Sequence, residues 1–307
     1  MQLLYNGIDI LNHKGVALSS CVVTDNAGGV ADTLELVFSD TSGLWGIWRP
    51  AFDDVVEWVQ DGWGTGKMYI DDITDTDTIF RIGARSLPPA ARQSGTTAWE
   101  NVRFSKIASD LAVISGLTVR SHNITDYNYV RFDRKNESSL QALNRLCQRE
   151  GYALKVTNGV AIIYGEKSFE NFHSTGTIQP KIYSFKNQDI GRRGVELRWT
   201  DGAGELIQGA AVDDAINAET EIITDIPVYS VAEAQRWSAG YLRQFNKHRK
   251  VGHLCTDRDL TLAAGNVVTV DVSRMFAGDY FIEQIKHEFV GGSKSHYKVR
   301  GSIGGDY

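Results

Sequence analysis

The stretch LTLAAGNVVTVDVSRMFAGDYFIEQIKHEFVGGSKSHYKVRG, Leu260–Gly301, carries the strongest secondary-structure signal in the chain. A turn at Ala263–Asn266 leads into the valine-rich stretch Val267–Val272. Apolar and polar residues then alternate along Tyr280–His287, and a further strand pattern follows at Ser295–Arg300. Because alternation with a period of two places every second side chain on the same face, this stretch predicts an antiparallel β-sheet.

The N-terminal region, residues 2–85, shows the same type of pattern. Leu34, Leu36 and Phe38 alternate with polar or smaller residues along one strand. Lys67–Ile73 and Thr78–Arg85 read as a hairpin around a polar turn. The spacing of strands and turns predicts a small antiparallel barrel or sandwich.

The middle of the chain changes its period from two to about 3.6. Pro88-Pro89 marks the boundary, and helices are expected at Trp99–Ser115 and Ser139–Glu150. Ser138 with Gln141 has the spacing of a capping box at the start of the second helix. The tripeptide Thr157–Gly159 predicts a tight hairpin, so residues 99–166 are expected to form a compact α/β unit.

A third helix is expected at Val231–Lys247, again with a capping-box pattern, at Ser230 and Glu233. The predicted fold is therefore mainly β (α+β), with two antiparallel β-barrels and a small α/β insertion. The expected division is a first barrel at 1–87 with return strands at about 180–212, an insertion at 88–179, and a helix plus second barrel at 213–307.

Bulk composition excludes several classes of protein. The net charge of −6 argues against a nucleic-acid binder, which usually has a basic surplus. Cys21, Cys147 and Cys255 are odd in number and lack a metal-ligand spacing, so they read as buried free thiols. The N-terminus lacks the pattern of a secretory signal, and no window resembles a membrane span, so synthesis in the cytosol is expected.

Two motifs partly resemble ligand-binding loops, one for phosphate and one for calcium, but both are better explained as ordinary turns. Gly62–Lys67 is glycine-rich, but it lacks the spacing of a phosphate-binding loop. Four carboxylates cluster near the tip of the first predicted hairpin, at Asp71, Asp72, Asp75 and Asp77. A calcium loop that began at Asp75 would have Ile79 at its fifth position, which cannot ligate. A solvated hairpin is the preferred interpretation, with a weak cation site as the alternative.

No catalytic residue can be nominated from the sequence. The seven histidines form no zinc motif, although His287 and His296 could face each other across the last hairpin. No nucleophile-elbow motif surrounds a serine. The basic run Arg236–Lys250 reads as a packed helix with a solvated face, which could dock an acidic partner. We expect no catalytic, cofactor-binding or metal-binding residues, no cofactor, and no enzymatic activity.

The order of these motifs resembles the phage late control protein D family, the hub proteins of contractile-tail baseplates. The C-terminal stretch carries the family's turn-plus-strand pattern and the spaced residues that follow it: Ala264, Gly265, Asn266, Val267, Gly278, Tyr280, Ile282, Ile285 and His287. The middle is similar at both predicted helices, through Ile107, Ala108, Gly116-Leu117 and Asn136–Gly151. The start, VVTDNAGGVADTLELVFSDTSGLW, is similar to hub proteins of Gram-positive prophages and bacteriocin-like tails.

The resemblance implies a structural role in a virion or tail-like particle. Members of the family form a homotrimeric ring in which each chain supplies two tube-like barrels, so that three chains match a hexameric tail tube above and a trimeric spike below. The implied partners are further copies of the chain, the tube protein or tube initiator, the central spike and other baseplate proteins, with no nucleic acid or membrane. The spike is expected to be a separate chain. The alternatives are a tail-associated cell-wall hydrolase and a receptor- or carbohydrate-binding tail module.

Overall fold

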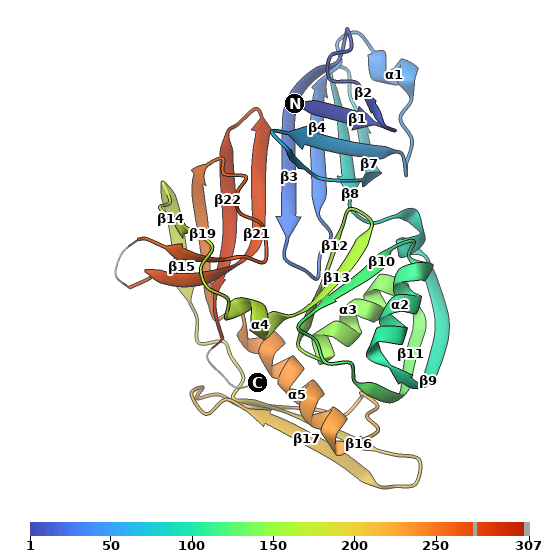
Figure 1. Cartoon of the computed structure of the whole chain (residues 1–307), viewed down its shortest axis with the longest axis vertical. Coiled ribbons are helices and arrows are strands. Elements are labelled where there is room, and N and C mark those ends of the chain that lie inside the picture. Colours follow the sequence, from blue (N-terminus) through green and yellow to red (C-terminus); the bar gives the residue numbers. More distant parts are fainter. Residues whose placement is uncertain (273–274, 304–307) are drawn as a thin grey trace.

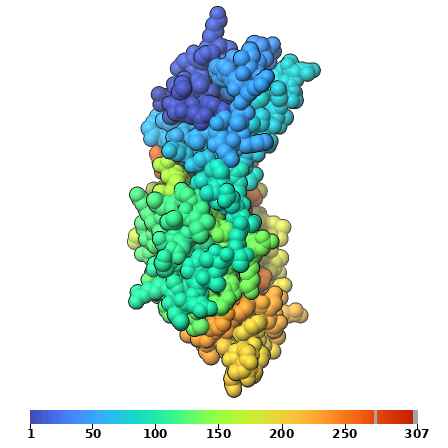
Figure 2. All heavy atoms as spheres, turned by 90° about the vertical axis from the view of Figure 1, so that its right-hand side faces the viewer, coloured from blue at the N-terminus to red at the C-terminus, as the bar shows by residue number. Residues whose placement is uncertain are grey.

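The computed structural model describes residues 1–272 and 275–303. Strands hold 48% of the chain and helices 17%, which confirms the predicted mainly β class. The molecule is elongated, with the N-terminal β region at one end, the α/β region in the middle and a hairpin at the other end (Figures 1 and 2). Residues 273–274 of the predicted C-terminal β stretch, and residues 304–307 of the predicted second barrel, lie outside the described ranges.

The N-terminal β region, called here the first lobe, is one curved sheet with its own core. Its elements are β1 (Gln2–Tyr5), β2 (Ile8–Asp9), β3 (Ala17–Asn26), β4 (Thr33–Ser39), α1 (Leu44–Trp48), β5 (Val55–Gln60), β6 (Trp63–Gly64), β7 (Met68–Asp75) and β8 (Ile79–Arg85). The strand order is β3-β4-β8-β7-β5-β1-β2, and β6 pairs with β5. The predicted alternation in β4 is confirmed, since Leu34, Leu36 and Phe38 are all buried. Trp45 closes this core by stacking on Phe80, with ring centroids 5.1 Å apart.

The C-terminal β region, the second lobe, contains the stretch that first indicated a β protein. Its strands are β14 (Thr177–Ile178), β15 (Ile182–Asn187), β19 (Lys250–Asp257), β20 (Val267–Val270), β21 (Gly278–Val290) and β22 (Lys294–Gly301). The order β15-β19-β22-β21 is antiparallel throughout, while β20 pairs with β21 and with the short parallel strand β14. A separate core fills this lobe around Tyr280, Phe281 and Tyr297.

The two lobes form a single continuous sheet. The C-terminal half of β21 pairs antiparallel with β3, so that His287 lies opposite Val23 and Gln284 lies opposite Asn26. Sequence periodicity predicted both β regions but not this backbone pairing between them, which joins segments about 260 residues apart.

The α/β region lies beside the ends of β3 and β4 (Figure 1). It comprises the 3-10 helix η1 (Pro89–Arg92), β9 (Ser94–Arg103), α2 (Phe104–Ile114), β10 (Thr118–His122), β11 (Asn128–Ser138), α3 (Ser139–Arg149), β12 (Tyr152–Thr157), β13 (Val160–Gly165) and α4 (Glu166–Glu170). Both halves of the predicted capping box are present at Ser138 and Gln141. Asn158 and Gly159 have φ values of 45° and 73°, the left-handed conformation that the predicted tight hairpin requires.

The predicted helix start at Trp99 was wrong. Strand β9 runs through Arg103, and its residues pair with β11, including Trp99 with Phe132. The helix begins only at Phe104, because cross-strand packing of the two aromatic rings holds residues 99–103 in the sheet.

The expected return strands do not complete the first barrel. Strand β15 pairs with β19 in the second lobe. The strands that follow form a separate sheet in the order β17-β16-β18: β16 (Gly194–Thr200), β17 (Leu206–Val212) and β18 (Thr220–Ile223). Helix α5 (Val231–Asn246) covers this sheet, and its Trp237 shares a core with Leu197 and with the α/β region. The alternating pattern at 180–212 was therefore read correctly as strand, but alternation cannot identify the strand's partner.

Helix α5 has only half of its expected capping box. The Ser230 hydroxyl accepts a hydrogen bond from the Glu233 amide at 3.1 Å. The Glu233 carboxylate instead accepts one from the Tyr229 amide at 2.7 Å.

Candidate functional site

A buried ion cluster lies where the second lobe, α4 and α5 meet. We call it the junction cluster; its members are Glu166, Glu170, Arg243, Lys247, Glu283 and Arg300. Four of these side chains, those of Arg300, Glu170, Arg243 and Glu166, are between 0% and 6% exposed. An isolated charge at such depth would raise the free energy of the folded state, so these groups are tolerated because each is paired with opposite charges.

Arg300, on β22, is the centre of the junction cluster. Its guanidinium lies 3.0 Å from Glu166 and 3.1 Å from Glu283, and it also pairs with Glu170. The same guanidinium lies over the ring of Phe281, 4.6 Å from the ring centroid. One planar cation thus ties β22 to both ends of α4 and to β21.

Helix α5 supplies the second and third cations. Arg243 lies 3.0 Å from Glu166 and 2.5 Å from Glu170, while Lys247 lies 3.2 Å from Glu166. Burial favours the neutral form of Glu166, but the charges of Arg300, Lys247 and Arg243 outweigh it and hold its pKa at about 2. The Glu166 carboxylate therefore stays ionised over the whole physiological range of pH.

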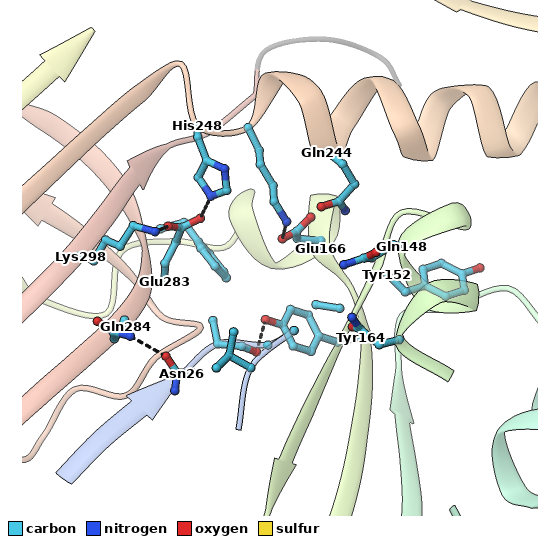
Figure 3. Close-up of a pocket in the computed structure, with 18 residues that line it drawn as sticks. Asn26, Gln148, Tyr152, Tyr164, Glu166, Gln244, His248, Glu283, Gln284 and Lys298 are labelled. Atoms are coloured by element: carbon cyan, nitrogen blue, oxygen red, sulfur yellow. Dashed lines mark hydrogen bonds and ion pairs between the residues drawn. The ribbon is translucent and has the colours of Figure 1, made fainter. Parts of the chain in front are cut away.

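A polar cavity of about 210 Å³ lies next to the junction cluster (Figure 3). Its walls come from the end of β3, from α3, α5 and β13, and from β21. The basic groups that face it are already engaged: Lys247 with Glu166, and His248 with Glu283 at 2.5 Å (Figure 3). Lys298 also pairs with Glu283, at 3.0 Å. Because these basic groups are paired with carboxylates on other elements, the arrangement fixes those elements relative to one another.

A second group of contacts joins the first lobe to the α/β region. Lys155 on β12 pairs with Asp25 and lies 3.7 Å from Asp32. The Gly29 amide donates to the Leu154 carbonyl at 2.9 Å, and the Ser86 hydroxyl donates to the Val156 carbonyl at 2.7 Å. The α/β region is therefore anchored to both lobes.

Comparison with solved structures identifies the architecture. The chain superimposes on a tail protein from Neisseria meningitidis MC58 with a TM-score of 0.75, covering 97% of this chain and 95% of that one at 11% identity. A 43 kDa tail protein of prophage MuSo2 from Shewanella oneidensis gives the same TM-score, with 98% of both chains covered at 14% identity. An E. coli component of the type VI secretion system, described as structurally similar to the T4 bacteriophage tail proteins gp27 and gp5, gives 0.60, covering 99% of this chain and 78% of that one at 10% identity.

The chain has the fold of a phage tail protein. Both lobes and the α/β region fall within the aligned length, because the alignments cover nearly the whole chain. No family model and no curated protein matches the sequence. The resemblance inferred from the order of short motifs is thus confirmed at the level of fold.

Within this tail-protein fold the basic run Arg236–Lys250 is not a solvated face. Arg236 pairs with Glu150 at 3.0 Å, and Arg243 and Lys247 belong to the junction cluster. Lys250 lies over the Tyr280 ring, 4.6 Å from its centroid. Most of the basic side chains that could have bound an acidic partner therefore contact carboxylates or aromatic rings of the same chain.

The glycine-rich and acidic motifs lie at one end of the tail-protein fold, in the first lobe. Gly62–Lys67 leads into strand β7 and not into a helix, so it lacks the architecture of a phosphate-binding loop. Asp72, Asp75 and Asp77 are exposed at the β7–β8 hairpin, and Asp71 pairs with Arg85 at 2.7 Å. Among the described residues, no group of three His, Cys, Asp or Glu side chains is placed to hold a metal ion.

The two histidines of the last hairpin point to opposite faces, so the suggestion that they could face each other was wrong. His287 lies opposite Ser295 and His296 lies opposite Lys286, and neighbouring positions of a strand alternate between faces. His296 contacts Glu288 at 3.1 Å. All three cysteines are buried and free, as expected. None of the described helices is both long enough and apolar enough to cross a bilayer.

The buried His287 should make stability depend on pH. Burial is the main cause that lowers the pKa of this imidazole to about 4, against smaller opposing effects of Asp25 and Asp259. Below pH 6.5 this imidazole takes up a proton in the unfolded chain but stays neutral in the folded chain, so the contribution of His287 to stability falls between about pH 6.5 and about pH 4. The full shift corresponds to about 3 kcal/mol.

Replacement His287→Gln should flatten this part of the stability profile, measured by urea unfolding at a series of pH values. The matched variant His122→Gln, at an exposed position, should keep the wild-type slope. An unchanged slope in His287→Gln would show that other groups cause the pH dependence.

Proposed function

We propose that this chain is the structural hub of the baseplate in a contractile phage tail or tail-like bacteriocin particle. Three copies form a ring that adapts the hexameric tail tube to the trimeric central spike. The observation that carries the proposal is the continuous sheet, in which two antiparallel β lobes with separate cores are joined edge to edge within one chain.

The doubling of the β lobes supports a ring with two kinds of symmetry. Three chains with two lobes each supply six lobes toward the tube, while the chains themselves repeat three times toward the spike. A head-to-tail contact that closes after three copies gives such a ring. The junction cluster supports the same role, because it fixes the second lobe to α4 and α5, while Lys155 and its carboxylate partners fix the first lobe to the α/β region.

The similarity in fold to the E. coli type VI secretion component supports a place in a contractile system. The expected partners are the tube protein or tube initiator, the central spike and other baseplate proteins. The expected location is the virion or tail-like particle after synthesis in the bacterial cytoplasm.

The role is proposed to be non-catalytic. The most buried charged groups of the junction cluster are paired with one another, which suits a structural part of the molecule. A zymogram on cell-wall substrate should show no lysis band from the purified chain. A clear band would favour the alternative of a tail-associated hydrolase.

The ring itself is tested by the mass of the purified chain in light scattering or mass photometry. We expect three times the chain mass of 34.0 kDa, either alone or together with the spike protein. A particle that stays monomeric and binds neither spike nor tube protein would contradict the proposal.

A further inference from the structure

The continuous sheet has two stretches of strand edge without a partner among the described residues: the outer edge of β15, at one end of the strand order, and the second half of β7, before the order continues through β5, β1 and β2. The path β15-β19-β22-β21-β3-β4-β8-β7 is antiparallel at every step. At one end β15 pairs only with β19. Farther along the order, β7 pairs with β5 through Met68 and Tyr69 only, so that Asp72–Asp75 pairs with β8 alone.

The directions of these two edges suit a head-to-tail contact. The path contains an even number of alternating strands, so β15 and β7 run in opposite directions. The outer edge of β7 in one copy can therefore receive β15 of the next copy as an antiparallel neighbour. The β21–β3 pairing already joins the two lobes in this way inside the chain.

The side chains on the two edges are complementary. Asp72, Asp75 and Asp77 are exposed and form no ion pair with any described residue. On β15, Lys186 is exposed and is likewise without an ion-pair partner among the described residues. Attraction between the acidic hairpin and the β15 edge would select this contact over like-charged ones.

Strand β15 also exposes apolar surface that an isolated edge strand normally avoids. Ile182 is 65% exposed and Tyr183 is 46% exposed. Natural proteins protect open edges by charge, bulges or cover, because an open apolar edge invites pairing with another chain. An edge of this kind is stable against aggregation when a specific strand covers it.

We propose that β15 of one copy pairs with the Asp72–Asp75 edge of β7 in the next copy, and that this contact closes the ring. The inference rests on the proposed function and names the surface through which the copies meet. The acidic hairpin, which carries no metal-binding geometry, then acts as the specificity element of that interface.

Charge reversal tests the contact. Lys186→Glu alone, or Asp72→Lys with Asp75→Lys, should raise the concentration at which half of the chains are trimeric by about tenfold or more, since each of the three contacts loses attraction and gains repulsion. The triple variant with all three reversals should return to within about threefold of wild type. Lys135→Glu, at an exposed lysine on β11 of the α/β region, is the control and should leave the midpoint unchanged.

The outcomes separate the two proposals. A wild-type chain that forms trimers unaffected by the reversals would overturn the edge contact and leave the ring standing. Loss of trimers in the single-edge variants without recovery in the triple variant would also overturn the pairing. A wild-type chain that never forms trimers, alone or with the spike protein, would overturn the proposed function itself.

Discussion

Replacement of Arg300 by leucine should lower the free energy of unfolding by about 3–5 kcal/mol, the largest effect that we expect from any single substitution. The guanidinium is fully buried between Glu166, Glu170 and Glu283. Leucine would leave three carboxylates with too little positive charge around them, at a depth where water cannot compensate. Urea unfolding at neutral pH measures the loss.

Arg131→Leu is the matched control for this substitution. Arg131 also contacts two carboxylates, Glu100 at 2.6 Å and Asp133 at 2.9 Å, but its side chain is 41% exposed. Because solvent screens exposed pairs, we expect a loss much smaller than that of Arg300→Leu. Equal losses in the two variants would mean that burial adds nothing to the junction cluster.

Replacement Gly240→Ala should destabilise the chain by about 1–3 kcal/mol, although alanine normally stabilises a helix interior relative to glycine by about 1 kcal/mol. Gly240 lies where α5 crosses the end of α3. A Cβ atom there would meet the Arg149 carbonyl and lie 2.7 Å from the Gln148 carbonyl oxygen. These neighbours are backbone atoms, so the two helices would have to separate.

The control for this prediction is Gly46→Ala in helix α1, where a Cβ atom meets nothing within 4 Å. Its unfolding free energy should be unchanged or should rise by up to about 1 kcal/mol. The opposite signs of the two alanine substitutions test the close approach of α5 and α3. If Gly240→Ala proved stabilising, the helices would have to lie farther apart than described.

Local sequence patterns predicted most of the helices and strands of this fold, because each pattern arises from burial or hydrogen bonding that the folded element has. The alternation of Leu34, Leu36 and Phe38 reflects one buried face of β4. The Ser138–Gln141 spacing reflects real hydrogen bonds at the start of α3. The predictions were wrong where a strand from another part of the chain decides the local structure. Residues 99–103 form a strand and not a helix because β11 lies beside them.

The junction cluster could not be predicted from the sequence. Arg300 follows Val299 on β22, so the two side chains point to opposite faces of the sheet, and alternation assigns the polar one to solvent. In the folded chain both residues are buried, because the α4 and α5 charges lie against the second face. One feature of the sequence pointed weakly to the junction cluster. Arg243 and Lys247 are one helical turn apart and lie close to the apolar stripe of α5, where buried cations need partners.

A hub is defined by its copy number and by its place in the particle. A cryo-electron microscopy reconstruction of the assembled tail end, calculated without imposed symmetry, tests both most directly. The account predicts three copies of this chain in one ring between tube and spike, with each copy placing its two β lobes under two neighbouring tube subunits. Six copies in the ring, or a position at the periphery away from the axis, would contradict it.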